Sequence, residues 1–185
     1  MQQDEALKRL RSNDTTLTSL NLYGNDLGEV GGAAVAGALE RNTTLTTLGL
    51  GWNALGEGGG AAVAGALERK TTLTTLDLRG NGLGDVGGAA VAGAMERNTT
   101  LMTMDLGGNH LGEVGGAAVA GALERNTTLT SLNLGCNGVR DDTLERVRRL
   151  LSGRVVVAGS EAVDGVSVKA AVVAPPRGTK RGAPG

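Results

Sequence analysis

Residues Thr72–Asn98 read TLTTLDLRGNGLGDVGGAAVAGAMERN, and this stretch recurs along the chain with few changes. Its front half carries the pattern L-x-x-L-x-L-x-x-N, which ends at Asn81. Equivalent asparagines follow one another at intervals of 28 residues: Asn25, Asn53, Asn81, Asn109 and Asn137. A fixed period between about 20 and 50 residues is typical of a solenoid, in which each unit stacks on the next.

Each unit combines the spacing of a β-strand with that of a helix. In the first unit Leu20 and Leu22 follow the strand period, so the residues beside them point to the opposite face. Further on, Val35 and Leu39 fall on one side of a helix. Stacked units then form a parallel sheet covered by a layer of helices. Because helices are about 10 Å wide and strands are spaced by about 4.8 Å, we expect the stack to curve with its strands on the concave side.

The first residues align with the end of a unit rather than with its start. Residues 1–13 predict a short helix with Leu7 and Leu10 on one side. We interpret this segment as an N-terminal partial repeat that caps the array, or as the remainder of a unit in a larger protein. The repeat domain itself spans residues 14–153 and contains five units.

The fifth unit departs from the others because charged residues replace the small apolar residues of its helix. An apolar stripe remains at Leu144, Val147 and Leu151, so we interpret this helix as a C-terminal cap. Residues 154–185 lack the repeat and contain all three prolines of the chain. We expect this tail to be partly disordered, although residues 155–157 and 166–173 have weak strand character.

The repeated unit closely resembles the leucine-rich repeat of ribonuclease-inhibitor type. The resemblance rests on L-x-x-L-x-L-x-x-N-x-L-G, a small-apolar helix and N-T-T-L, and it covers about residues 14–151. It implies an α/β leucine-rich-repeat solenoid, a horseshoe segment with a parallel β-sheet on the concave face and α-helices on the convex face. The same repeat type occurs in NOD-like receptors and Ran GTPase-activating proteins. The family also implies that the periodic asparagines bond backbone groups in their turns and form a ladder between units.

The composition argues against several classes of protein. Net charge is −1 with interspersed signs, so the sequence predicts neither a nucleic-acid-binding face nor attraction to an anionic membrane. The N-terminus lacks the apolar segment of a signal peptide, and no apolar run approaches the roughly 20 residues of a membrane span. Cys136 is the only cysteine, so it has no partner for an internal disulfide. We expect a reduced, cytoplasmic protein that is a monomer and uses no cofactor.

One segment matches a catalytic motif by its letters. Residues Gly82–Gly87 read GLGDVG, and G-x-G-x-x-G between a strand and a helix is typical of dinucleotide binding. Three other units carry Asp26, Ala54 and His110 at the place of Gly82, while the remaining glycines belong to the repeat. The periodicity therefore favours a structural role for this motif.

His110 and Cys136 follow the strands of neighbouring units, where a Cys–His nucleophile pair is one interpretation. Because no orienting group or further ligand clusters with them, we favour two variable turn positions and expect neither catalysis nor a metal. Threonines such as Thr46 and Thr74 form a row on the same face of the sheet, which we attribute to strand propensity.

Glycine is frequent in the predicted helices. A glycine in a helix costs about 1 kcal/mol relative to alanine. The second unit has three in a row, Gly58, Gly59 and Gly60, so we predict that its helix is the least stable of the array.

A few offsets vary while the rest of the unit repeats, and they lie at the end of each strand and in the following turn. Drift of solvated positions after duplication explains such variation, but tyrosine, tryptophan and arginine also dominate binding hot spots. We therefore expect a recognition surface around Tyr23, Trp52 and Arg79, with Asp77 and Asp105 as an acidic rim. The full candidate set is Asn21, Tyr23, Trp52, Asp77, Arg79, Asp105, His110, Asn133 and Cys136.

These features predict a non-catalytic protein–protein interaction module. It would recognise an unidentified partner protein through its concave face and strand-to-helix loops, as a NOD-like-receptor repeat region or a similar protein. Two alternatives stay open. One is a GTPase-activating regulator resembling Ran GTPase-activating protein, and the other is a structural repeat protein without a specific partner.

Overall fold

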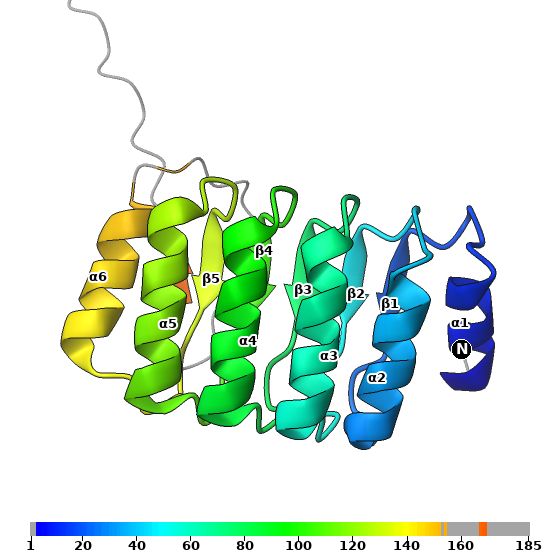
Figure 1. Ribbon diagram of the computed structural model, residues 1–185, viewed down its shortest axis with the longest axis horizontal. Coiled ribbons are helices and arrows are strands. Elements are labelled where there is room, and N and C mark those ends of the chain that lie inside the picture. Colours follow the sequence, from blue (N-terminus) through cyan, green and yellow to red (C-terminus); the bar gives the residue numbers. More distant parts are fainter. Residues whose placement is uncertain (1–2, 153, 155–166, 170–185) are drawn as a thin grey trace, which may run out of the picture.

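Short strands alternate with helices along the whole repeat region, as the periodicity predicts. The computed structural model describes residues 3–152, 154 and 167–169. The helices form one layer, and the strands form a second layer behind them in the view of Figure 1. The strands are β1 (Ser19–Asn21), β2 (Thr47–Gly49), β3 (Thr75–Asp77), β4 (Thr103–Asp105), β5 (Ser131–Asn133) and β6 (Ser167–Lys169). The helices are α1 (Gln3–Arg11), α2 (Gly28–Leu39), α3 (Gly56–Arg69), α4 (Gly84–Arg97), α5 (Gly112–Arg125) and α6 (Asp141–Leu151).

The register of the sheet follows the 28-residue period of the sequence. Strands β1 to β5 pair in parallel, and each residue lies opposite its equivalent in the next unit, as Leu20 does opposite Leu48. The sheet side chains that point away from the helices form a surface that we call the strand face. It corresponds to the predicted concave face and bears Ser19, Asn21 and their equivalents.

The core lies between the two layers and is built mainly from leucine. In the second unit Leu45, Leu48, Leu50 and Leu55 are fully buried, and Val63 packs on them from α3. The two aromatic residues of the chain lie outside this core and are exposed. The same positions recur in every unit, so burial is nearly uniform along the array.

The helix glycines allow the helices to approach closely. A Cβ atom placed on Gly32 would lie 3.1 Å from Cα of Gly59, and one on Gly60 would lie 2.5 Å from Cδ2 of Leu83. The close packing of units therefore requires residues without a side chain at these positions, which offsets their poor helix propensity. Gly58 is different, because its equivalents in α2 and α4 are the exposed Val30 and Val86.

Both ends of the helix layer are covered by amphipathic helices. Leu10 of α1 is fully buried against the array, and Val147 and Leu151 of α6 are buried at the other end. Strand β6 pairs antiparallel with β5, within the stretch whose sequence has weak strand character. Apart from Arg154, the rest of the tail lies outside the described residues, and so does the prediction that it is disordered. No described helix has the length and apolar character that crossing a bilayer requires.

Candidate functional site

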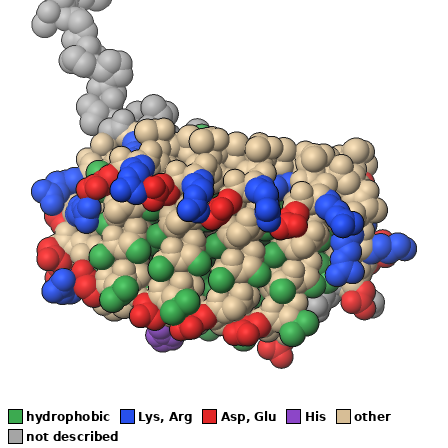
Figure 2. Space-filling model, viewed as in Figure 1, with side chains coloured by type: hydrophobic (Ala, Val, Ile, Leu, Met, Phe, Trp, Pro, Cys, Tyr) green, Lys and Arg blue, Asp and Glu red, His purple; other side chains and the backbone are tan. Residues whose placement is uncertain are grey.

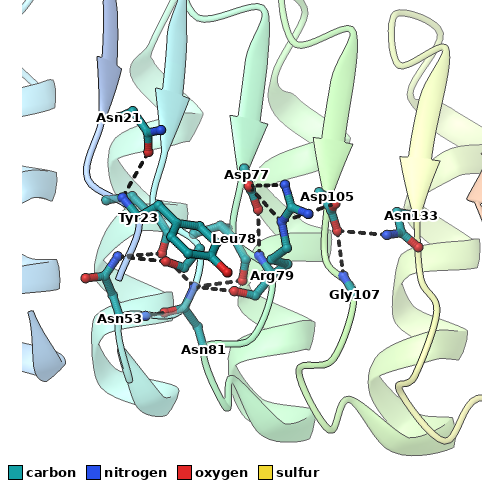
Figure 3. A network of polar contacts seen from close by, with 12 residues as sticks. Asn21, Tyr23, Asn53, Asp77, Leu78, Arg79, Asn81, Asp105, Gly107 and Asn133 are labelled. Atoms are coloured by element: carbon teal, nitrogen blue, oxygen red, sulfur yellow. Dashed lines mark hydrogen bonds and ion pairs between the residues drawn. The ribbon is translucent and has the colours of Figure 1, made fainter. Parts of the chain in front are cut away.

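Several of the predicted site residues form one polar network on the strand face, shown in Figure 3. Arg79 donates a hydrogen bond from Nε to Oδ2 of Asp77 at 2.9 Å, and its Nη2 lies 2.8 Å from the same oxygen. Its Nε also lies 3.7 Å from Oδ2 of Asp105. Asp105 in turn accepts a hydrogen bond of 3.0 Å from Nδ2 of Asn133. The network therefore crosses three adjacent units, from β3 to β5.

The hydrogen bond from Arg79 to Asp77 raises the pKa of the guanidinium above its ordinary value, and the negative charge of Asp105 adds to the shift. Arginine remains charged at any physiological pH in any case. The main effect of the two carboxylates is to fix the position of the Arg79 guanidinium, which is half exposed over the strand face.

Tyr23 of the first unit lines the same groove as this network. Its backbone N–H donates to Oδ1 of Asn21 at 2.9 Å, and the residue is 51% exposed. A Cβ atom placed on Gly51 would lie 3.0 Å from Cδ2 of Tyr23 and 3.1 Å from Cγ of Arg79. The glycine thus leaves a gap that the ring and the arginine stem enter from either side. One groove on the strand face is lined by Asn21, Tyr23, Asp77, Arg79 and Asp105.

Trp52 lies apart from that groove, at the start of the turn after β2. The residue is 60% exposed, and its indole lies against the next unit, since a Cβ on Gly80 would be 2.7 Å from Cδ2 of the ring. Its φ of 56° is in the left-handed region, where glycine stands at the equivalent positions Gly24 and Gly80. A bulky residue there is an outlier, and local strain of this kind is often associated with functional sites.

His110 and Cys136 also occupy left-handed positions, with φ of 57° and 56°. Both are exposed, and no hydrogen bond joins them within the described residues. No group of metal-ligating side chains occurs in the described part of the chain. The variable turn offsets are therefore positions where the backbone favours glycine, which sequence reasoning did not recognise. Their side chains project outward from a strained turn.

The comparisons agree with this architecture. A family model described as Leucine Rich repeat matches the chain five times, at residues 13–36, 41–64, 69–92, 97–120 and 125–145. The chain belongs to the leucine-rich-repeat family. A comparison with the curated proteins finds no match.

Two solved structures share the leucine-rich-repeat fold of this chain. Leiomodin-1 actin-binding site 2 is 26% identical with a TM-score of 0.74, and the match covers 80% of this chain and 86% of that one. The tropomodulin C-terminal domain of Caenorhabditis elegans is 16% identical with a TM-score of 0.73, and the match covers 82% and 92% of the two chains. The second likeness shows the fold alone.

The asparagines of the leucine-rich repeat tie each turn to the next. Nδ2 of Asn53 donates to the carbonyl oxygens of Leu22 and Leu50 at 2.8 and 2.9 Å, and Oδ1 accepts from the N–H of Asn25 at 2.9 Å. Equivalent bonds are made by Asn81, Asn109 and Asn137. Asn25 differs because no strand precedes β1 among the described residues, and its exposed amide donates only to the carbonyl of Tyr23.

A second ladder of asparagines lies at the opposite end of the helices, and sequence reasoning missed it. Nδ2 of Asn98 donates to the carbonyl oxygens of Leu67 and Lys70, while Oδ1 accepts from the N–H of Leu101 at 2.8 Å. Asn126 makes equivalent bonds to the next unit. The signal was present in the sequence, since the asparagine of N-T-T-L has the same 28-residue period.

Lys70 interrupts this second ladder. Its side chain is buried, and Nζ donates to the carbonyl and side-chain oxygens of Asn42. Burial lowers the pKa of the ammonium group. An ammonium group has no acceptor, so it offers nothing to the N–H of Leu73, whose equivalent Leu101 is bonded by an asparagine.

The glycines of the dinucleotide-like motif have structural roles in the leucine-rich repeat. Gly82 and Gly84 adopt φ of 64° and 61°, and the N–H of Gly84 donates to the carbonyl of Asn109 at 3.0 Å. Gly87 packs against Leu83 and the backbone of Glu57. Each glycine is thus accounted for by the turn or by the contact with a neighbouring unit.

Proposed function

We propose that this leucine-rich-repeat protein recognises a partner protein through its strand face and the adjoining strand-to-helix loops. The observation that carries the proposal is that Tyr23, Trp52 and Arg79, from three consecutive units, are all exposed just beyond the ends of strands β1, β2 and β3. Tyr23 and Trp52 are about half exposed or more, although large aromatic side chains normally lie in a core.

Aromatic residues and arginine supply most of the binding energy at typical protein interfaces. The guanidinium of Arg79 is already held by Asp77 and Asp105, so little side-chain freedom is lost when a partner contacts it. By contrast, the charged groups at the C-terminal ends of the helices are paired with each other.

The test is capture of proteins from a cell lysate by the full chain and by the triple variant Tyr23→Ala, Trp52→Ala, Arg79→Ala. We expect the variant to lose specifically captured proteins, with each affinity falling at least about 30-fold. The matched control replaces three exposed valines of the helix layer by alanine, namely Val30, Val86 and Val114. This control variant should still capture the same proteins. Retention of every captured protein by the triple variant would contradict the proposal.

Actin is the first specific partner that we propose to test. Support comes from the likeness to leiomodin-1, whose matched region is described as an actin-binding site. Purified filamentous actin should carry the full chain into the pellet on centrifugation, and the triple variant should stay in the supernatant. If the wild-type chain also stays in the supernatant, actin is excluded and the search returns to the proteins captured from lysate.

We further propose that the protein is a monomeric, cytoplasmic module of ribonuclease-inhibitor type that binds without catalysis. The 28-residue unit and the 14-residue helices α3, α4 and α5 support the type. Structural roles for the glycines of the dinucleotide-like motif support a non-catalytic function. Stimulation of GTP hydrolysis by the purified chain would instead favour the GTPase-activating alternative.

A further inference from the structure

A second groove lies beside Trp52, where the turns of the first three units meet. Its lining includes Asp26 from the first unit, Trp52 and Ala54 from the second, and Gly80 and Gly82 from the third. The indole is the only large side chain among the lining residues, and the rest of the lining is glycine, alanine and one asparagine apart from Asp26. The groove is thus an apolar recess that has a carboxylate on its border.

Charge is distributed unequally between the two edges of the helix layer. At the C-terminal ends of the helices, glutamates pair with arginines of the next helix, so positive and negative groups alternate along one row in Figure 2. The pairs are Arg69–Glu40, Arg97–Glu68, Arg125–Glu96 and Arg146–Glu124, at 2.5 to 2.6 Å. These four pairs neutralise most of the charge at this edge within the protein.

The opposite edge, which adjoins the groove, is acidic and largely unpaired. Asp26, Glu29, Glu57 and Asp85 form no ion pair within the described residues, and a row of acidic side chains is visible along that edge in Figure 2. Arg140 is a basic residue at this edge, and it is held by Glu113 at 3.1 Å at the far end of the array.

Two of these carboxylates have a clear structural role, whereas Asp26 does not. Carboxylate oxygens of Glu29 and Glu57 lie 2.8 Å from Cβ positions built on Gly56 and Gly84, at the first turns of α3 and α4. Negative charge there is stabilised by the helix dipole. Asp26 precedes α2 in a left-handed turn with φ of 52° and makes no hydrogen bond within the described residues. It is therefore available to a ligand.

We propose that the groove beside Trp52 receives a lysine or arginine side chain of the partner protein, which makes the partner's binding segment basic. This inference rests on the proposed function. A cation over an indole is attracted by the negative face of the ring, and Asp26 supplies the opposite charge at the border of the same recess. The unpaired carboxylates of Glu29 and Glu57 extend the attraction along the edge and favour encounter with a basic segment.

The experiment uses the full chain, in which Trp52 is the only tryptophan and reports on its own surroundings. The probes are two acetylated seven-residue peptides, one alternating glycine with arginine and the other alternating glycine with the neutral isostere citrulline. We expect the arginine peptide to change the Trp52 emission saturably, and the citrulline peptide to bind at least about threefold more weakly. Raising the salt concentration should weaken the binding of the arginine peptide and leave that of the citrulline peptide unchanged.

The decisive variant is Asp26→Asn, and Asp85→Asn is its matched control because Asp85 is also unpaired but lies outside the groove. Asp26→Asn should lower the affinity for the arginine peptide about threefold, while Asp85→Asn should leave that affinity unchanged. Absence of saturable binding, equal binding of both peptides, or equal effects of the two variants would overturn the inference. The proposed function fails separately, if the Tyr23, Trp52 and Arg79 triple variant retains all captured proteins.

Discussion

Tyr23 and Arg79 come within reach of each other across Gly51, although they belong to the first and the third repeat unit. A Cβ placed on Gly51 would lie 3.0 Å from the tyrosine ring and 3.1 Å from the arginine stem. The ring and the guanidinium line one groove, and the unit between them leaves room for both because it carries glycine two residues after β2. The recognition surface is a property of three units together.

We predict that Gly51→Ala separates Tyr23 from Arg79 without unfolding the array. Both side chains have solvent beside them, so they should swing outward, and stability should fall by no more than about 0.5 kcal/mol. Because Tyr23 is the only tyrosine, its ring signals in an NMR spectrum report the change directly. Gly107→Ala is the control, since it crowds Asn133 and Asp105 in the equivalent place two units away. Unchanged Tyr23 signals in Gly51→Ala would contradict the prediction.

Lys70→Asn should stabilise the protein by roughly 1–2 kcal/mol. The change removes a buried ammonium group and restores an amide whose Oδ1 accepts the N–H of Leu73, as Asn98 does for Leu101. Urea denaturation measures the gain. Lys8→Gln removes an exposed positive charge and should have little effect, while Asn98→Lys should destabilise. A loss of stability in Lys70→Asn would show that the lysine stem contributes more than the interrupted ladder costs.

The pH dependence of stability gives a second test of Lys70. Its pKa is lowered in the folded protein, so the unfolded chain binds more protons in the window below 10.5. The free energy of unfolding should therefore increase as pH rises toward 10.5. That part of the increase should be absent in Lys70→Asn and preserved in Lys8→Gln.

The sequence period accounts for most of the fold but for less of the site. Because equivalent residues stand opposite each other in the sheet, the period alone predicts the strand register, the leucine core and the turn asparagines such as Asn81. The same 28-residue period also marks the second ladder at Asn98 and Asn126. Strand β6 and its antiparallel pairing with β5 have no repeated signal.

The site was only partly predictable from the sequence. It depends on the backbone conformation of the turns and on the absence of a side chain at Gly51, between Tyr23 and Arg79. The variable offsets at Trp52 and His110 are recognisable in the sequence. Their left-handed backbone is signalled only by glycines at equivalent positions, such as Gly80 and Gly82, and not by the tryptophan or the histidine. Nor does the period reveal that Gly51 allows Tyr23 and Arg79 to approach. The candidate recognition residues are those that differ between units. Which of them lie close together depends on contacts between units, and these contacts are seen only in the structure.

The helix of the second unit, α3, offers a direct test of helix propensity. Gly58 of α3 stands where α2 and α4 carry valine, and the nearest atoms to a Cβ there belong to the carboxylate end of the Glu29 side chain, at 2.9 Å. Gly58→Ala should therefore stabilise the protein by about 1 kcal/mol. In the wild type, amide exchange in α3 should be faster than in α5. Gly60→Ala is the contrast, because its Cβ would press on the buried Leu83 and destabilise. Equal protection of α3 and α5 from amide exchange would contradict the prediction that α3 is the least stable helix of the array.

Glu113 fastens the cap helix α6 to the last regular unit, and its titration should be visible in acid. The backbone N–H of Arg140, the hydroxyl of Thr143 and the guanidinium of Arg140 donate to its carboxylate at 2.9, 2.7 and 3.1 Å. These bonds lower its pKa from 4.5 to about 2, with the backbone bond the largest cause.

The folded-state pKa of Glu113 is depressed, so its contribution to stability is present above pH 4.5 and is lost as pH falls toward about 2. Glu113→Gln should destabilise the protein at pH 7 and should reduce the loss of stability across that acid window. Denaturation midpoints between pH 7 and pH 2 measure both effects. Glu68→Gln removes a carboxylate paired with Arg97 between α3 and α4, away from this junction, and serves as the control. If both variants change the acid window equally, the effect reflects general charge and not the junction between α5 and α6.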